Sequence, residues 1–174
     1  MNLKIIDDFL SSYHADTFIR IFDGEHRGEG GFPWFFVTNL NNERSLGNYY
    51  FNHILIDKEQ IYYNRNQLSI FNPLLDMLKV PISDVYRLKV NLYPWTQRRI
   101  HHKSHTDYPS GFDLTTALYY VNDNDGVTIF DGKKTVKSKK NRVVLFDGSI
   151  RHHSTTPTKD NYRCTINIDY KKKK

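Results

Sequence analysis

The chain has 174 residues, of which 39% are hydrophobic and 14% aromatic, so it is long enough to bury a core and too apolar to be disordered throughout. Its net charge is +6, and its single cysteine, Cys164, excludes an intramolecular disulfide. The first residues include two early aspartates, and no window approaches about 18 apolar residues. We therefore expect no signal peptide, no transmembrane helix and a cytoplasmic location.

Two helices are predicted in the first half of the chain. Ser11 or Ser12 can cap the first helix, and Asp23-Gly24 can end it. The second helix is predicted over residues 67–79, where apolar residues recur on one face. Between them, the sequences FPWFF and YYFNHILI are rich in aromatic and β-branched residues, which is typical of strands.

After Pro81 the sequence changes to short strand-like segments separated by turn signals such as NDNDG, KSKKN and TTPTKD. These segments cover residues 85–93, 113–122, 127–132, 142–148 and 162–170. Many short strands at nearly even spacing favour a jelly roll of two sheets. We expect a mainly β protein with N-terminal helices, in the α+β class.

We expect one domain over residues 1–174, because no linker or composition break divides the chain. Residues 1–84 would form a supporting region of helices and strands. Residues 85–170 would form the jelly-roll core with the candidate site, and residues 171–174 a basic tail.

The segment HHKSHTDYPSG, residues 101–111, contains a candidate metal site. His105 and Asp107 are two residues apart, so on a strand both side chains would project from one face. This pair alone is a weak signal, because a polar turn can contain the same residues. A further histidine, His153, lies downstream, and Arg163 follows it ten residues later.

Two histidines and one carboxylate on one face of a metal leave adjacent coordination positions open, as in the facial triad of non-haem Fe(II) oxygenases. The open positions can take a bidentate 2-oxo acid and O2. The far carboxylate of the 2-oxo acid then needs a buried cation, and the planar fork of an arginine suits it.

The pattern HTD followed by H-x(9)-R resembles the Fe(II)/2-oxoglutarate-dependent dioxygenases, and more narrowly their prolyl-4-hydroxylase-like branch. The resemblance extends to RLKVNLYPWT, to LYYVND with DGVTIFDG, and to RVVLFDGSIRHHSTTPTKDNYRCTINI. The N-terminal half looks like compact phage and marine-bacterial members, with less specific motifs. The implied fold is a double-stranded β-helix, which is a jelly roll.

The resemblance also implies roles for individual residues. His105, Asp107 and His153 would hold the iron. Arg163 would bind the C5 carboxylate of 2-oxoglutarate. Three further residues would contribute to the co-substrate pocket, against the alternative that they only pack. Tyr120 would add a hydrogen bond to that carboxylate, Tyr93 would face the co-substrate, and Asn167 would line the pocket.

Two neighbouring histidines compete with the implied ligands. His152 precedes His153, but the spacing to the following proline and arginine in the family favours His153. His152 is then interpreted as a surface or supporting histidine. His101 and His102 are interpreted as loop residues at the mouth of the site.

The implied reaction is hydroxylation of an unactivated C–H bond, coupled to decarboxylation of 2-oxoglutarate to succinate and CO2, with Fe(II) and O2 required and ascorbate a candidate accessory. The resemblance favours a prolyl residue of a peptide or protein, or a free amino acid, as substrate. Arg98, Arg99 and Lys103 beside the motif indicate an anionic substrate.

Two alternatives remain. The first is a nucleic-acid-directed oxygenase of the same superfamily, although the second arginine of such enzymes is replaced by Asp169. The second is a non-catalytic jelly-roll module that binds a metal or a partner. No membrane partner is expected.

Overall fold

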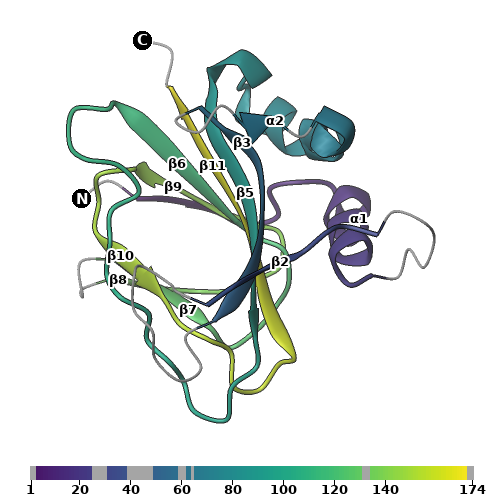
Figure 1. The fold of residues 1–174 in the computed structure, drawn as a ribbon, viewed down its shortest axis with the longest axis vertical. Coiled ribbons are helices and arrows are strands. Elements are labelled where there is room, and N and C mark those ends of the chain that lie inside the picture. The colour runs from purple at the N-terminus through teal and green to yellow at the C-terminus, as the bar shows by residue number, and fades with distance from the viewer. Residues whose placement is uncertain are drawn as a thin grey trace.

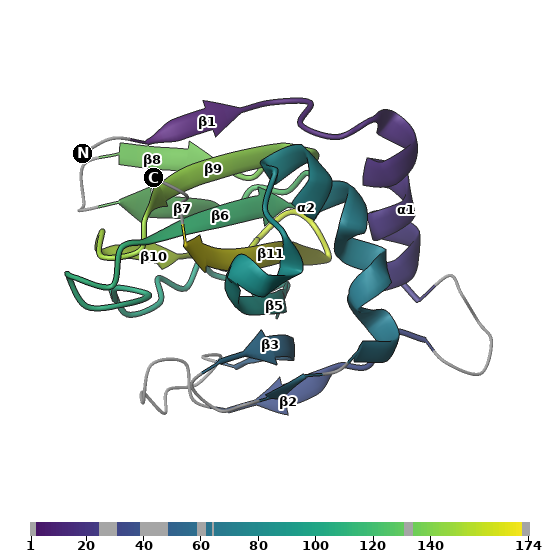
Figure 2. The same cartoon turned by 90° about the horizontal axis from the view of Figure 1, so that it is seen from above.

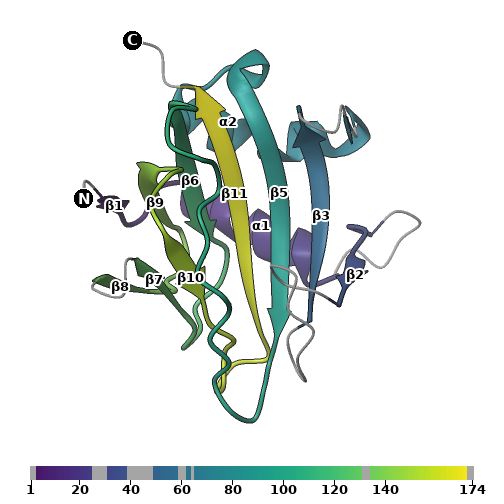
Figure 3. The same ribbon diagram turned by 60° about the vertical axis from the view of Figure 1, so that its left-hand side comes forward.

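The computed structural model describes residues 3–24, 31–38, 49–58, 62–63, 65–130 and 134–171. Its main feature is an antiparallel sheet with the order β1-β9-β6-β11-β5-β3-β2, and β4 pairs with β3 off this path. In chain order these strands are β1 (Lys4–Ile6), β2 (Phe35–Val37), β3 (Tyr50–Asp57), β4 (Tyr62–Tyr63), β5 (Val85–Pro94), β6 (Leu114–Tyr120), β9 (Arg142–Asp147) and β11 (Tyr162–Lys171). Figure 3 shows the large sheet nearly face on.

A smaller antiparallel sheet has the order β10-β7-β8 and faces one side of the large sheet (Figure 1). Its strands are β7 (Val127–Phe130), β8 (Lys134–Lys137) and β10 (His152–Ser154). The helices α1 (Ser12–Phe22) and α2 (Asn72–Leu78) cover the opposite side, as the view from above also shows (Figure 2). Two short 3-10 helices, Arg65–Phe71 and Ile82–Asp84, flank α2.

The side chains of the central strands alternate between two environments, as the pleat of a β-strand requires. On β11, Ile166 and Ile168 belong to the apolar cluster that also contains Phe18 of α1 and Leu74 of α2. The alternate residues of β5 and β11 are polar and face the small sheet. The helices therefore cover the apolar face of the large sheet, and a polar interior is left between the two sheets.

The predicted jelly-roll fold is confirmed, and each predicted strand after Pro81 corresponds to a strand of the structure. The first helix is also confirmed, with Ser11 as its cap, whose side chain accepts from the N–H of His14. The second predicted helix is split into a 3-10 segment and α2, because Pro73 lies at the start of α2 and lacks the N–H of a helix interior. Residues 131–132 of one predicted strand and 172–174 of the predicted tail lie outside the described residues.

Neither described helix has the length or the apolar character that crossing a bilayer requires. The helices α1 and α2 have 11 and 7 residues, which is well short of the roughly 20 needed for a transmembrane helix.

Candidate functional site

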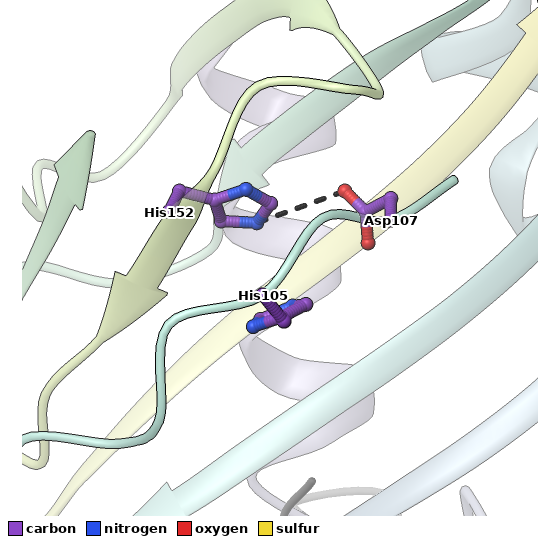
Figure 4. A group of neighbouring side chains, drawn as sticks. All are labelled: His105, Asp107 and His152. Carbon is purple, nitrogen blue, oxygen red and sulfur yellow. Dashed lines mark ion pairs between the residues drawn. The ribbon is translucent and has the colours of Figure 1, made fainter. Parts of the chain in front are cut away.

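Three side chains converge between the two sheets, as Figure 4 shows. His105 and Asp107 come from the segment between β5 and β6, and His152 comes from β10. Each offers one candidate ligand atom, and these atoms lie within 4.8 Å of one another. The structure thus brings the two residues of the predicted HTD motif together with a distant histidine.

That distant histidine is His152, whereas the sequence analysis expects His153. Successive side chains of a strand point to opposite faces, and His152 points toward His105, with 4.7 Å between ring centroids. His153 points the other way, with its Nε2 3.5 Å from His101 Nδ1. The backbone fixes this choice, because the N–H groups of His105 and His152 donate to each other's carbonyl at 2.9 and 2.8 Å. The third candidate ligand is therefore His152, one residue before the predicted His153.

Both histidines of the group orient their rings through backbone carbonyls. His152 Nδ1 lies 2.9 Å from the carbonyl of Ile150, and His105 Nδ1 lies 3.3 Å from that of Lys103. Because a carbonyl oxygen only accepts, each Nδ1 carries the hydrogen, and in the neutral ring Nε2 is then an acceptor. His152 Nε2 lies 3.6 Å from Asp107 Oδ2, so two acceptors face each other in a position that suits a cation.

The chemistry of this group fits a non-haem iron. Two imidazole nitrogens and one carboxylate make up the donor set of the facial triad. Burial and the neighbouring His152 lower the pKa of His105 to about 4, which keeps its ring neutral at pH 7 and able to ligate a metal.

Asp107 is held by a buried network. Arg87 Nη2 donates to Asp107 Oδ1 at 2.8 Å, and Arg87 Nε donates to Asp169 Oδ2 at 2.9 Å. The hydroxyl of Thr116 donates to Asp169 Oδ1 at 2.6 Å. Burial alone would raise the pKa of Asp107, but His152 and Arg87 hold it below its usual value. Burial and the charge of Asp107 raise the pKa of Asp169. Asp107 therefore stays ionised in a fixed orientation.

Arg163 is 1% exposed, and all its hydrogen-bond partners are neutral. It donates from Nη2 to Thr128 Oγ1 at 2.7 Å, from Nε to Ser138 Oγ at 3.1 Å, and from Nη1 to the carbonyl of Thr155 at 3.3 Å. No carboxylate among the described residues forms an ion pair with it. A buried guanidinium without a counter-charge suits an anionic ligand, because burying an unpaired charge is costly.

The two predicted pocket tyrosines lie beside this arginine. The guanidinium carbon of Arg163 is 5.5 Å from the ring centroid of Tyr93 and 5.7 Å from that of Tyr120. The hydroxyl of Tyr120 donates to Thr128 Oγ1 at 2.7 Å. Burial raises the pKa of both tyrosines, so both remain neutral donors.

A cavity of about 70 Å³ connects the two groups, and His105, His152, Tyr93 and Arg163 all line it. Asn167, the remaining predicted pocket residue, also lines the cavity and accepts from Asn91 Nδ2 at 3.0 Å. Three further residues of this region were not predicted from the sequence: Arg87, Lys89 and Thr128. The signal was present for two of them, because Arg87 and Lys89 alternate with apolar residues along β5.

The residues around the motif have roles that differ in part from the expected ones. Arg99, expected to attract an anionic substrate, donates to Asp125 Oδ2 at 2.7 Å and so holds a loop. His102, expected at the mouth, is 5% exposed and stacks on Tyr93 at 5.0 Å between ring centroids. Its Nε2 is buried and has no hydrogen-bond partner within the residues that the structure describes.

The sequence matches no protein-family model and no curated protein. Among solved structures, the chain is similar to a prolyl hydroxylase from Trichoplax adhaerens, solved with a hypoxia-inducible-factor peptide fragment. The TM-score is 0.63 and the identity 16%, and the match covers 97% of this chain and 83% of that one.

Two other solved structures show a similar likeness. The viral collagen prolyl hydroxylase of Paramecium Bursaria Chlorella virus-1, solved with 2-oxoglutarate, matches with a TM-score of 0.60 and 14% identity, over 97% of this chain and 95% of that one. A non-haem α-ketoglutarate-dependent epimerase from nogalamycin biosynthesis matches with a TM-score of 0.64 and 12% identity, over 97% and 76%. At these identities the likeness establishes a shared fold, which in these proteins supports different reactions.

Proposed function

We propose that this chain is an Fe(II)- and 2-oxoglutarate-dependent hydroxylase, in which His105, Asp107 and His152 hold the metal and Arg163 binds the far carboxylate of 2-oxoglutarate. The observation that carries the proposal is the pairing of two features in one cavity. A group of two histidines and a carboxylate lies beside a buried arginine that lacks a counter-charge.

When bound, Fe(II) and 2-oxoglutarate supply the oxidising chemistry, in which the 2-oxo acid loses CO2 to give succinate and one oxygen atom of O2 enters a C–H bond. The chain's own residues supply position and charge. Arg163 offers a planar fork to a carboxylate in a cavity, where such a charge-assisted pair is strong. Arg87 keeps Asp107 ionised and oriented.

The residues around Arg163 prepare it for that ligand. Thr128 accepts hydrogen bonds from both Arg163 and Tyr120, so the hydrogen of its own hydroxyl remains to be donated. The rings of Tyr93 and Tyr120 flank the guanidinium and limit water access to it. A preorganised arginine loses little side-chain entropy when it binds.

The first test adds Fe(II) and 2-oxoglutarate to metal-free protein without oxygen and follows the visible metal-to-ligand charge-transfer band. We expect the band in the wild type. In Arg163→Met, the affinity for 2-oxoglutarate should fall by about 2–5 kcal/mol, the usual cost of removing one side of a buried charge pair. Arg163→Lys should recover only part of it, because an ammonium lacks the planar fork.

The adjacent histidines provide a matched pair of variants. His152→Ala should abolish Fe(II) binding, and His153→Ala should retain it, because only the side chain of His152 faces Asp107. The opposite result would return the ligand to His153. Protein that binds Fe(II) but gives no band would instead favour a metal-binding module without oxygenase activity.

As substrate we propose a prolyl residue of a peptide or protein, or a free amino acid. The prolyl hydroxylases among the similar structures support this choice. A nucleic-acid substrate gains no support from position 169, because Asp169 is buried and accepts from Arg87.

A further inference from the structure

The inner faces of β5 and β11 form a ladder of polar pairs across the floor of the cavity. Its four rungs, in order, are Arg163–Tyr93, Thr165–Asn91, Asn167–Lys89 and Asp169–Arg87. Lys89 and Arg163 are the two basic side chains other than histidine that line the cavity. They lie two rungs apart, which is four residues or about 13 Å along the strand.

The charge of Lys89 has no partner within the described part of the chain, where its Nζ takes part in no hydrogen bond or ion pair. The charges of three buried carboxylates act on it, namely Asp107, Asp169 and Asp57, and the first two of these accept hydrogen bonds from Arg87 instead. Burial, followed by the charge of Arg87, lowers the pKa of Lys89 to about 8, so the side chain is mostly protonated at pH 7. A half-buried ammonium that opens into a cavity without a counter-ion is suited to an anionic ligand.

Lys89 lies close to the triad. It lines the same cavity as His105 and His152, and its charge lowers the pKa of both His105 and Asp107. The two carboxylates of 2-oxoglutarate already have proposed partners, namely Arg163 and the metal. An anion at Lys89 would therefore belong to a second molecule held beside the metal.

We propose that Lys89 binds a carboxylate of the substrate that is oxidised, and that this substrate is a free amino acid. The inference rests on the proposed function and narrows its substrate class. The amine of Lys89 is a single point charge with three donors, which suits one carboxylate.

A second observation favours an amino acid over a simple acid. The side-chain oxygen of Asn91 is buried and has no hydrogen-bond partner among the described residues, and it lies on the rung between Lys89 and Arg163. Buried acceptors in native structures nearly always have a donor. The amino group of a bound amino acid would supply that donor while its carboxylate pairs with Lys89.

The test uses holoprotein with Fe(II) and 2-oxoglutarate and a panel of free amino acids, with L-proline first. Each amino acid is compared with its carboxamide, which lacks the negative charge, and with its N-acetyl derivative, which lacks the amine. Succinate formation in air and the shift of the charge-transfer band without oxygen report on catalysis and binding. In the wild type, kcat/KM should be at least about 30-fold higher for a free amino acid than for its carboxamide, which corresponds to about 2 kcal/mol, the lower end of the cost of removing one side of a buried charge pair.

Lys89→Met keeps most of the length of the unbranched side chain and removes its charge. In this variant the preference for the carboxylate should disappear, while the dissociation constant of 2-oxoglutarate should stay within about twofold of the wild-type value. Lys89→Arg should recover part of the preference. Thermal unfolding of each variant establishes that it is folded.

Several outcomes would overturn the inference. A loss of 2-oxoglutarate affinity in Lys89→Met would assign Lys89 to the co-substrate. A wild type that responds equally to acids and carboxamides, or only to peptides with blocked ends, would exclude an amino-acid carboxylate at Lys89. A wild type that forms no charge-transfer band would instead contradict the proposed function, which distinguishes the two failures.

Discussion

Strand β11 carries a charged residue near each end of its inner face, and the fold surrounds these two residues differently. At one end, Asp169 is paired with Arg87, which also holds Asp107. At the other end, Arg163 has only neutral hydrogen-bond partners in the described part of the chain. Both side chains are almost completely buried, so burial alone does not distinguish them. The difference indicates that Asp169, at the metal end of this strand, is neutralised by an ion pair. The unpaired charge of Arg163, at the other end, is available to bind an anionic ligand.

The largest loss of stability is expected from Arg87→Met, which removes the ion pairs with Asp107 and Asp169. Asp107 and Asp169 would then be buried together without the guanidinium that pairs with both, at side-chain exposures of 2% and 0%. Removing one partner of a buried ion pair typically costs about 3–5 kcal/mol. We expect that loss in the free energy of unfolding of the metal-free protein, measured in urea. Adding Asp169→Asn to this variant should recover part of the lost stability. A cost below about 1 kcal/mol for Arg87→Met alone would contradict the stabilising role of these ion pairs.

A smaller loss of stability is expected from Gly126→Ala, which displaces the unpaired Arg163. A Cβ atom at this position would lie 2.8 Å from Arg163 Cδ and 2.8 Å from Asn124 Oδ1, which is too close. Overpacking of this kind typically costs about 1–3 kcal/mol, and the displaced arginine should bind 2-oxoglutarate more weakly. Gly148→Ala is the matched control, because its nearest contact would be 3.4 Å. Equal 2-oxoglutarate affinity in the two variants would mean that Arg163 tolerates displacement.

The pH dependence of stability tests the burial of His102, which stacks on Tyr93 near the unpaired Arg163. Burial, with the charge of Arg163, lowers the pKa of His102 from 6.5 to about 3. The unfolded chain therefore binds a proton below pH 6.5 that the folded chain does not. The free energy of unfolding should fall as the pH decreases from 6.5 toward 3, by at most about 1.4 kcal/mol per pH unit for this group.

The variant His102→Phe isolates this contribution, because it keeps a ring beside Tyr93 and removes the titrating group. Urea unfolding of both metal-free proteins at several pH values should give a shallower pH dependence for the variant. Identical slopes would show that His102 is not buried as a neutral ring.

The smallest effect is expected from Arg142→Met, which removes an ion pair of similar geometry at the surface. Arg142 has the same side-chain exposure as Arg87, 18%, but its partner Asp7 is 37% exposed. Exposed pairs typically contribute less than about 1 kcal/mol to unfolding free energy. If Arg142→Met lowered the free energy of unfolding as much as Arg87→Met, burial of the carboxylates would not explain the contribution of the Arg87 ion pairs to stability.

The sequence predicts the long central strands of the large sheet well because their apolar alternation is local, but it does not predict the short strands β1, β8 and β10. It also brings His105 and Asp107 together, since two residues of one short segment share a side. The choice between His152 and His153 depends on which face of β10 points inward, and that is set by the pairing of His152 with Phe130 on β7 and by the bridge to His105. The spacing of the family motif does not show which side of β10 each side chain faces. The predicted ligand, His153, therefore differs by one residue from the histidine that faces Asp107.

The partners of the charged residues could not be predicted in the same way. Arg87, Asp107 and Asp169 are separated by 20 and 82 residues along the hydrogen bonds that join them. A local pattern shows that Lys89 shares a face with Arg87, but only the three-dimensional structure shows that one of them is paired and the other is not.

The bridge between His105 and His152 ties the segment between β5 and β6 to the small sheet. His152 belongs to a strand of only three residues in the small sheet, while Arg87 ties Asp107 to the large one. A metal held by all three residues would add a further link between β10 and the residues that Arg87 ties to the large sheet. Amide hydrogen exchange along β10, β7 and β8 should then slow when the metal is added. The exchange rate of the small sheet, which supplies one candidate ligand, would thus report metal occupancy.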